Sequence, residues 1–200
     1  ALAWGEMQEA RCVWGDGFLR SIEGQLRLKL FWHSLNDDAV FEPWIRITAA
    51  CQTPPGGAFG LPVQWKHSDE ERGSRQLDPP IKTLDDAKKL VQPHHVIDEE
   101  ETARRVERAQ QAVGDILDIA VDRMPVYRVW NADLSTQLGW LRGIEQMMWD
   151  MVDNPEWLHG VLTFLRDGVL QVHEEAEEAG DWRLCDHENQ AIPYAEELAD

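Results

Sequence analysis

The stretch Gly143–Asp181, GIEQMMWDMVDNPEWLHGVLTFLRDGVLQVHEEAEEAGD, decides the fold because it predicts two helices joined at a sharp corner. Asp153 is a candidate cap for the second helix, and Pro155 suits its first turn, where the missing N–H of proline costs nothing. Gly180 ends the second helix. Apolar residues recur along it with a period close to 3.6, at Trp157, Val161, Phe164, Leu165, Val169 and Val172.

The segments on either side of this stretch alternate between helix and strand patterns. Helical periodicity covers Phe18–Ser34 and Asp98–Val113, and Thr83 opens a capping-box pattern that predicts a short helix. Strand patterns rich in β-branched and aromatic residues cover Ala39–Thr48, Ile116–Val121 and Arg183–His187. Such alternation is typical of parallel α/β architecture.

One long segment breaks the alternation. Residues 52–80 begin rich in proline and glycine and continue strongly polar, which predicts a loop insertion within a single domain spanning residues 1–200. No phosphate-binding glycine pattern, neither GxGxxG nor GxxxxGK[ST], follows any predicted strand. This disfavours a doubly wound nucleotide-binding sheet.

The chain is strongly acidic. It carries 37 Asp and Glu against 19 Lys and Arg, a net charge of −18. This charge argues against binding to nucleic acid or to an anionic membrane, and no apolar run approaches the roughly 20 residues that span a bilayer. The three cysteines are widely spaced and form no CxxC pair, which favours a reducing, cytoplasmic location.

The pattern of Gly143–Gly180 resembles the corresponding segment of the uroporphyrinogen decarboxylase superfamily, which includes methyltransferases acting on corrinoid (cobalamin-type) cofactors. Glu23–Ile47 and Pro79–Val91 resemble further segments of that superfamily. The resemblance implies a TIM-type (β/α)8 barrel, which takes about 250 residues when complete. With about four strands predicted, we expect the first half of such a barrel, and an open strand edge that pairs with another copy or with the remainder.

Active sites of such barrels lie at the carboxyl ends of the strands, and four segments of this chain fall there. Glu42 lies beside apolar neighbours, and its carboxylate needs a partner if it is buried. The sequence favours neither a functional role nor a structural role for it. Asp38 precedes the same strand, where a strand-start cap is the favoured role. The candidate catalytic residues are Glu42, His187 and Glu188, and the candidate pocket-lining residues are Trp4, Glu6, Trp44, Trp130, Asn131 and Asn189.

Tryptophan is abundant, with ten residues in the chain. Trp4, Trp44 and Trp130 each lie in or just after a predicted strand. If those strands line a barrel, the three rings would wall a pocket for a large flat ligand; ordinary packing of large apolar side chains is the alternative.

Histidine and cysteine raise the question of a metal site. Cys185 and His187 alternate onto one strand face, which suits two zinc ligands, while a buried thiol beside a polar loop is the alternative. The methyltransferases that this chain resembles bind zinc through a His-x-Cys motif and a distant cysteine, whereas the Cys-x-His here is reversed and lies too early. We therefore assign no metal ligand in this chain, and zinc and a corrinoid are implied only for the complete protein. His94 and His95 predict a surface loop, because adjacent side chains diverge.

The resemblance implies methyl transfer between a corrinoid carried on a partner protein and a small methyl donor or acceptor. Porphyrinogen decarboxylation is the first alternative. It is disfavoured because the Arg-Gln-Ala-Gly-Arg signature that clamps substrate carboxylates is absent, and Trp4 and Glu6 stand at the equivalent strand. A divergent, non-catalytic barrel that binds a ligand in a Trp-rich cavity is the second alternative.

Overall fold

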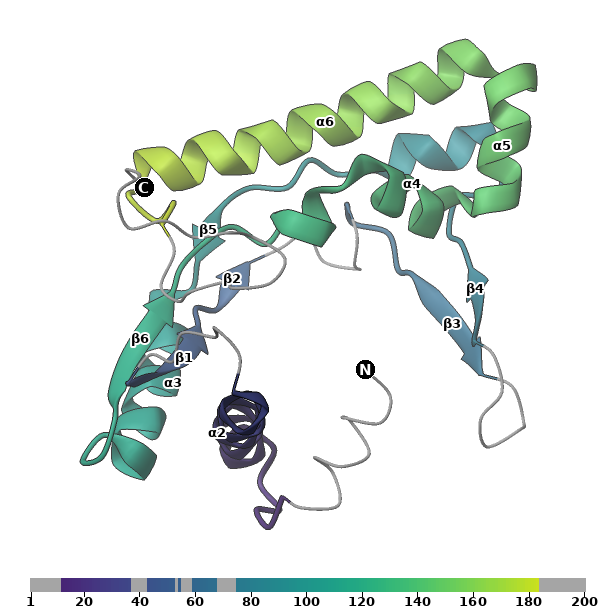
Figure 1. Cartoon of the computed structure of the whole chain (residues 1–200). Coiled ribbons are helices and arrows are strands. Elements are labelled where there is room, and N and C mark those ends of the chain that lie inside the picture. Colours follow the sequence, from purple (N-terminus) through teal and green to yellow (C-terminus); the bar gives the residue numbers. More distant parts are fainter. Residues whose placement is uncertain (1–11, 37–42, 53, 55–58, 68–74, 184–200) are drawn as a thin grey trace. The chain divides into compact units, whose positions relative to one another are not determined.

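The computed structural model describes residues 12–36, 43–52, 54, 59–67 and 75–183, and the chain divides into two compact units (Figure 1). Unit 1 is built from described residues within Ala1–Ala50 and Glu99–Asp122, and unit 2 from those within Cys51–Asp98 and Arg123–Trp182. The α/β character predicted from the sequence is confirmed. Each unit has its own hydrophobic core and is described separately.

Unit 1 combines one parallel pair of strands with two helices. β1 (Trp44–Thr48) and β6 (Asp118–Asp122) lie side by side and run parallel (Figure 1). The helices are α2 (Gly17–Leu35) and α3 (Glu99–Val113). The helix predictions are confirmed to within a residue or two at each end, because local capping and periodicity specify these elements.

Both helices of unit 1 pack on the same face of the strand pair. Ile45 and Ile47 of β1 are buried, and they meet Ile22 from α2 and Ala109 from α3. Successive side chains of a strand point to opposite faces. The other face of β1 is therefore formed by Trp44, Arg46 and Thr48.

Side chains from the two helices donate hydrogen bonds to backbone carbonyl groups of β1. Gln25 Nε2 donates to the carbonyl oxygen of Arg46 at 3.1 Å, and Lys29 Nζ donates to that of Trp44 at 2.9 Å. Arg105 Nη1 donates to the carbonyl oxygen of Thr48 at 3.3 Å. Carbonyl groups satisfied in this way are protected from pairing with a strand of another chain.

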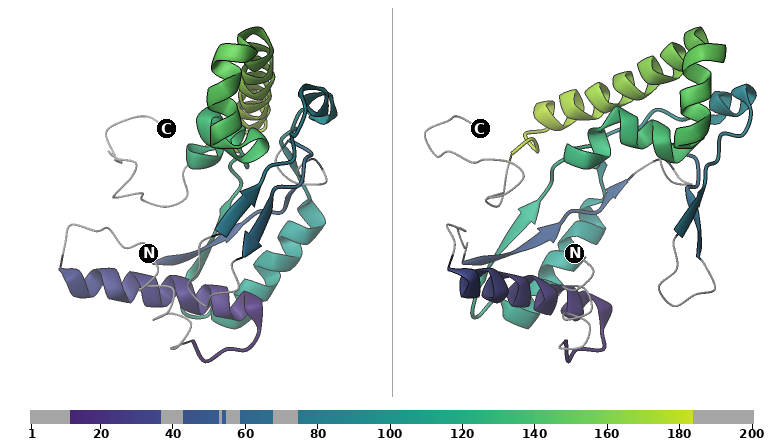
Figure 2. Two further views of the ribbon diagram at one scale, coloured as in Figure 1. Left: turned by 90° about the vertical axis from the view of Figure 1, so that its right-hand side faces the viewer. Right: turned by 45° about the vertical axis from the view of Figure 1, so that its right-hand side comes forward.

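Unit 2 is mainly helical, and α5 meets the beginning of α6 at a corner (Figure 2). Its helices are α4 (Leu134–Arg142), α5 (Ile144–Asp153) and α6 (Pro155–Glu178), with the 3-10 turns η1 (Leu84–Lys89) and η2 (Val129–Ala132). Its strands are β2 (Cys51–Gln52), β3 (Gln64–His67), β4 (Arg75–Asp78) and β5 (Val96–Ile97). β2 pairs with β5 and β3 pairs with β4, and both pairs are antiparallel.

The β3–β4 hairpin lies within residues 52–80, where the sequence predicts only a loop. Its register pairs Gln64 with Asp78 and His67 with Arg75. The strands are short and mostly polar, so they lack the alternating apolar pattern that marks a half-buried strand. Only the pairing of two segments distant in sequence reveals them.

The predicted corner between the two helices is confirmed at α5 and α6. Pro155 takes the first position of α6, as expected. The cap position belongs to Asn154, and Asp153 is instead the last residue of α5, so the prediction of Asp153 as the cap is wrong. Although α6 runs over 24 residues, no helix in the described ranges is both long and apolar enough to cross a membrane.

The core of unit 2 forms where α4 and α6 meet the loops before and after them. Leu165 of α6 and Leu141 of α4 are fully buried, and the rings of Phe59 and Tyr127 meet at a tilt with 4.7 Å between their centroids. The backbone N–H of Phe59 donates to the hydroxyl of Tyr127 at 3.0 Å. The buried set comprises Phe59, Leu61, Ile81, Tyr127, Leu138, Leu141, Leu158, Val161, Leu165, Val169 and Val172.

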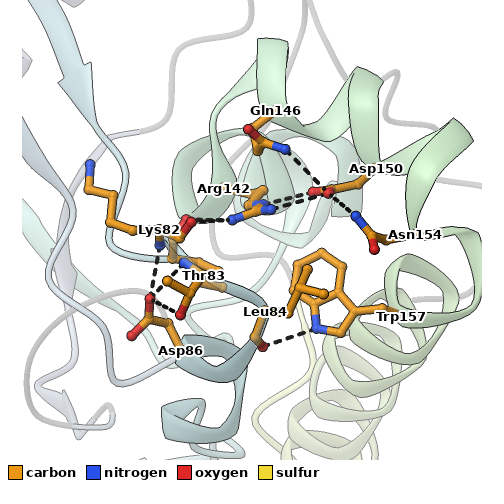
Figure 3. Close-up of polar contacts among 10 residues, drawn as sticks. Lys82, Thr83, Leu84, Asp86, Arg142, Gln146, Asp150, Asn154 and Trp157 are labelled. Atoms are coloured by element: carbon orange, nitrogen blue, oxygen red, sulfur yellow. Dashed lines mark hydrogen bonds and ion pairs between the residues drawn. The ribbon is translucent and has the colours of Figure 1, made fainter.

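A buried ion pair joins α4 to α5 (Figure 3). Arg142 Nε donates to Asp150 Oδ2 at 2.7 Å and Nη2 to Oδ1 at 3.1 Å, with both side chains at most 4% exposed. Asn154 Nδ2 also donates to Asp150, and Arg142 Nη1 donates to the carbonyl oxygens of Ile81 and Lys82. Because each charge has several partners, burial is tolerated here.

Candidate functional site

Three of the nine residues predicted for a site lie in the described part of the chain. Trp44 begins β1 in unit 1, while Trp130 and Asn131 lie in η2 of unit 2. The others lie outside the described residues, namely Trp4, Glu6, Glu42, His187, Glu188 and Asn189.

Trp44 lies on the face of the strand pair opposite to the helices. In the parallel register, Trp44 is beside Asp118, Arg46 beside Ala120 and Thr48 beside Asp122. These side chains therefore share one face. The face combines an aromatic ring and a guanidinium with a hydroxyl and a carboxylate at the carboxyl ends of the strands.

The carboxyl end of the pair is held firmly. The backbone N–H of Ala49 donates to the carbonyl oxygen of Asp122 at 2.8 Å, and that of Ala50 donates to Thr102 Oγ1 at 3.0 Å. Asp122 and Thr102 are both buried. This end of the sheet is thus the rigid edge on which a barrel would carry its site.

Trp130 and Asn131 follow β6 at a short distance in sequence. Trp130 is 73% exposed, so its ring contributes little to the core of unit 2. Gln137 Nε2 donates to the carbonyl oxygen of Asn131 at 2.8 Å, which fixes η2 against α4. Both residues lie in a 3-10 turn and not in a strand.

The structure also brings together a cluster that sequence reasoning missed. Arg123, directly after β6, donates from Nε to Asp181 Oδ1 at 2.6 Å. His95 Nε2 lies 3.1 Å from the other oxygen of the same carboxylate. The His95 side chain is only 2% exposed, so the prediction of a surface loop at His95 is wrong.

A second carboxylate supports the same loop. Glu175 of α6 accepts a hydrogen bond from the backbone N–H of His95 at 2.6 Å, and its other oxygen lies 2.8 Å from His94 Nδ1. Gln171 Nε2 donates to the latter oxygen at 3.0 Å. His94 itself is 58% exposed and remains on the surface, as predicted.

Both carboxylates are held ionised. Burial opposes ionisation of Asp181, but the hydrogen bonds and charges of Arg123 and His95 outweigh it and lower its pKa below the ordinary value. The pKa of Glu175 is lowered in the same way, with burial opposed by Gln171, the backbone of His95 and His94. The negative charge of each carboxylate is thus stabilised by its hydrogen-bond partners.

This cluster fixes the course of the chain after α6. Its buried side chains are out of reach of a substrate. A carboxylate bound to one ring nitrogen fixes the orientation of an imidazole, but His95 is buried and out of reach of a ligand. Asp181 follows Gly180, and its backbone N–H caps α6 at the carbonyl oxygen of Ala176. The cluster therefore sets where the chain leaves α6, just before the predicted strand Arg183–His187.

Sequence signals for this cluster were weak. His95 and Asp181 are 86 positions apart, and neither lies in a recognisable motif. The one local hint is the position of Arg123 at the carboxyl end of β6.

The described residues offer no ready-made metal site. Within those ranges, no group of three or more His, Cys, Asp or Glu side chains is arranged to hold a metal ion. Comparison with known protein families, with curated proteins and with solved structures found no match to this chain.

Proposed function

We propose that this chain is a uroporphyrinogen decarboxylase-like protein and acts in methyl transfer between a corrinoid held by a partner protein and a small methyl donor or acceptor. Its strands would belong to a partial TIM-type (β/α)8 barrel. The site would lie on the face of β1 and β6 that carries Trp44, with Glu42, His187 and Glu188 as the proposed reactive groups.

One observation carries the proposal. β1 and β6 run parallel, and α2 and α3 both pack on the face of Ile45 and Ile47. A doubly wound sheet has helices on both faces, whereas a barrel has them only outside. The face of Trp44, Arg46 and Thr48 would then line the barrel interior. A further strand beside β1 would have to displace Gln25 and Lys29 from its carbonyls.

The chemistry needs a nucleophile and a methyl donor. In the direction away from the corrinoid, a thiolate sulfur forms a bond to the methyl carbon. A methylated corrinoid would supply the methyl group and keep the electron pair of the cobalt–carbon bond, and the thiol proton would pass to a base. The wall of Trp44 would support the flat corrinoid ring, as aromatic faces do in stacked contacts.

Zinc would activate the thiol by lowering its pKa. The described residues do not form a site that fits zinc. What the described residues would supply is orientation of the methyl carrier.

The test is a spectroscopic assay on the purified chain with methylcobalamin and 2-mercaptoethanol. We expect the methyl–cobalt absorption band to disappear faster with the protein than without it. Trp44→Ala should lower the rate by about tenfold or more, and Trp44→Phe should retain most of it. Trp65→Ala is the matched control, because Trp65 is 45% exposed on β3 in the other unit.

Two results would overturn the proposal. A rate equal to the protein-free rate would exclude methyl transfer by this chain under these conditions. Release of carbon dioxide from a porphyrinogen, with no change in methylcobalamin, would favour the decarboxylase alternative.

A further inference from the structure

Helix α5 is attached to the rest of unit 2 largely by its polar side. Asp150 is fully buried against Arg142, and Gln146 Nε2 donates to it at 3.4 Å (Figure 3). Met147 is the apolar residue of α5 that packs against the core. Most helices of a globular protein bury their apolar stripe, whereas α5 leaves most of its apolar side chains exposed beside Glu145, Gln146 and Asp153.

The outward side of α5 is apolar and continuous. Ile144, Met148 and Val152 are spaced by four residues and therefore form a stripe along one helix face, with exposures of 67%, 61% and 76%. Trp149 and Met151 flank the stripe and are 59% and 55% exposed. Five large apolar side chains on ten residues make a patch of the kind that marks a protein interaction site.

The border of this patch is acidic. Glu145, Asp153 and Glu156 are exposed around it. From Ile144 to Leu165 the sequence contains no Lys or Arg. Methionine-rich surfaces adapt to varied apolar side chains, and an acidic border attracts cationic ones.

We propose that the outward face of α5 binds a basic amphipathic helix of a partner protein. The apolar stripe of that helix would lie on Ile144, Met148 and Val152, and its Lys or Arg residues would reach Glu145, Asp153 and Glu156. An amphipathic helix presents such apolar anchors at i, i+3, i+4 and i+7. This inference is independent of the proposed methyl transfer.

The sequence disfavours an occupant from this chain itself. Every undescribed segment that carries charge has more acidic than basic residues. A second copy would bring two acidic borders and two net charges of −18 together. The one basic amphipathic helix in the described residues, α2, already uses Phe18, Ile22 and Leu26 in the core of unit 1.

The experiment measures binding of a synthetic peptide to the purified chain. The probe is an 18-residue fluorescein-labelled helix with leucine on one face and lysine on the other, and the matched peptide has glutamate for lysine. We expect the lysine peptide to bind, and the glutamate peptide to fail to bind. Met148→Gln with Val152→Gln should weaken binding by about tenfold or more, because central apolar anchors dominate such interfaces.

The control variant is Leu170→Gln, since Leu170 is 50% exposed on α6 and lies outside the patch. It should change the affinity by less than about twofold. Circular dichroism checks that all variants fold. Equal affinity of the double variant and the unaltered chain would overturn the proposal, because binding would then reflect net charge alone. Self-association that the double variant abolishes, without peptide binding, would assign the face to a second copy instead.

Discussion

Units 1 and 2 bury charge and apolar surface in different ways. Unit 1 relies on a small aliphatic core between one face of a two-stranded sheet and two helices. Unit 2 has a larger core with aromatic residues and adds fully buried ions, of which Arg142–Asp150 is the clearest. Parallel strands are normally covered on both faces. Unit 1 therefore leaves one face of its strand pair for a ligand or for further structure, whereas the helices and loops of unit 2 enclose its core.

The largest expected effect comes from breaking the buried ion pair of unit 2. Asp150→Ala leaves Arg142 as an uncompensated buried charge and should lower the free energy of unfolding by about 3–5 kcal/mol. Urea unfolding followed by circular dichroism measures the loss. Asp167→Ala is the control, since Asp167 pairs with Arg166 on the surface and should cost less than about 1 kcal/mol. Equal losses in the two variants would contradict the importance of this pair.

The next effect compares the two cores directly. Leu165→Ala in unit 2 and Ile45→Ala in unit 1 each remove a fully buried side chain and should each cost about 2–5 kcal/mol. Hydrogen exchange shows where protection is lost. We expect each loss to be confined to amides of the same unit; loss spread equally over both would show that they unfold as one.

A smaller effect tests the rigid edge of unit 1. Thr102→Val keeps the shape of the side chain but removes the acceptor for the buried N–H of Ala50, which should cost about 1–3 kcal/mol. Thr102→Ser retains the acceptor and is the matched variant. If the valine variant were as stable as the serine variant, the hydrogen bond would contribute nothing.

The smallest effect is a pH dependence centred on unit 2. The folded-state pKa values of Asp150, Asp181 and Glu175 are all lowered. For a lowered carboxyl pKa, the stabilisation is fully present above the unfolded-state value of about 4 and is lost as the pH falls through the folded-state value. Unfolding measured from pH 7 to pH 3 should therefore lose stability mainly below about pH 4.

Asp181→Asn sharpens this prediction, because it removes one of the three carboxylates. The slope of stability against pH in the acid range should become shallower than in the unaltered chain. An unchanged slope would mean that Arg123 and His95 do not lower the pKa of Asp181 in solution.

Local features of the sequence predicted the regular elements well. The capping-box pattern at Thr83 is present, with Asp86 accepting from its backbone N–H at 2.8 Å, although the element is a 3-10 turn. The 3.6-residue period of α6 and Pro155 at its start were read correctly. The β3–β4 hairpin was missed, because its polar strands carry no apolar alternation.

For the candidate site, the sequence placed Trp44 within a predicted strand and Trp130 in or just after one, whereas the structure has Trp44 at the amino end of β1 and Trp130 in η2. It did not predict the cluster of His95, Arg123 and Asp181, whose members come from three separate segments. Local pattern cannot report a contact across 86 positions, because periodicity records only the environment averaged over a helix face or strand face.

The sequence by itself determined the limits of α2, α3 and α6 to within a few residues, the α/β character and the acidic composition, since each depends on neighbouring residues or on composition. The tertiary structure decided which face of α5 points outward, which carboxylates are buried and which carbonyls of β1 are covered. Asp150 illustrates the reason: by composition it belongs on the surface, and only the guanidinium of Arg142, brought beside it by the turn between α4 and α5, makes its burial favourable.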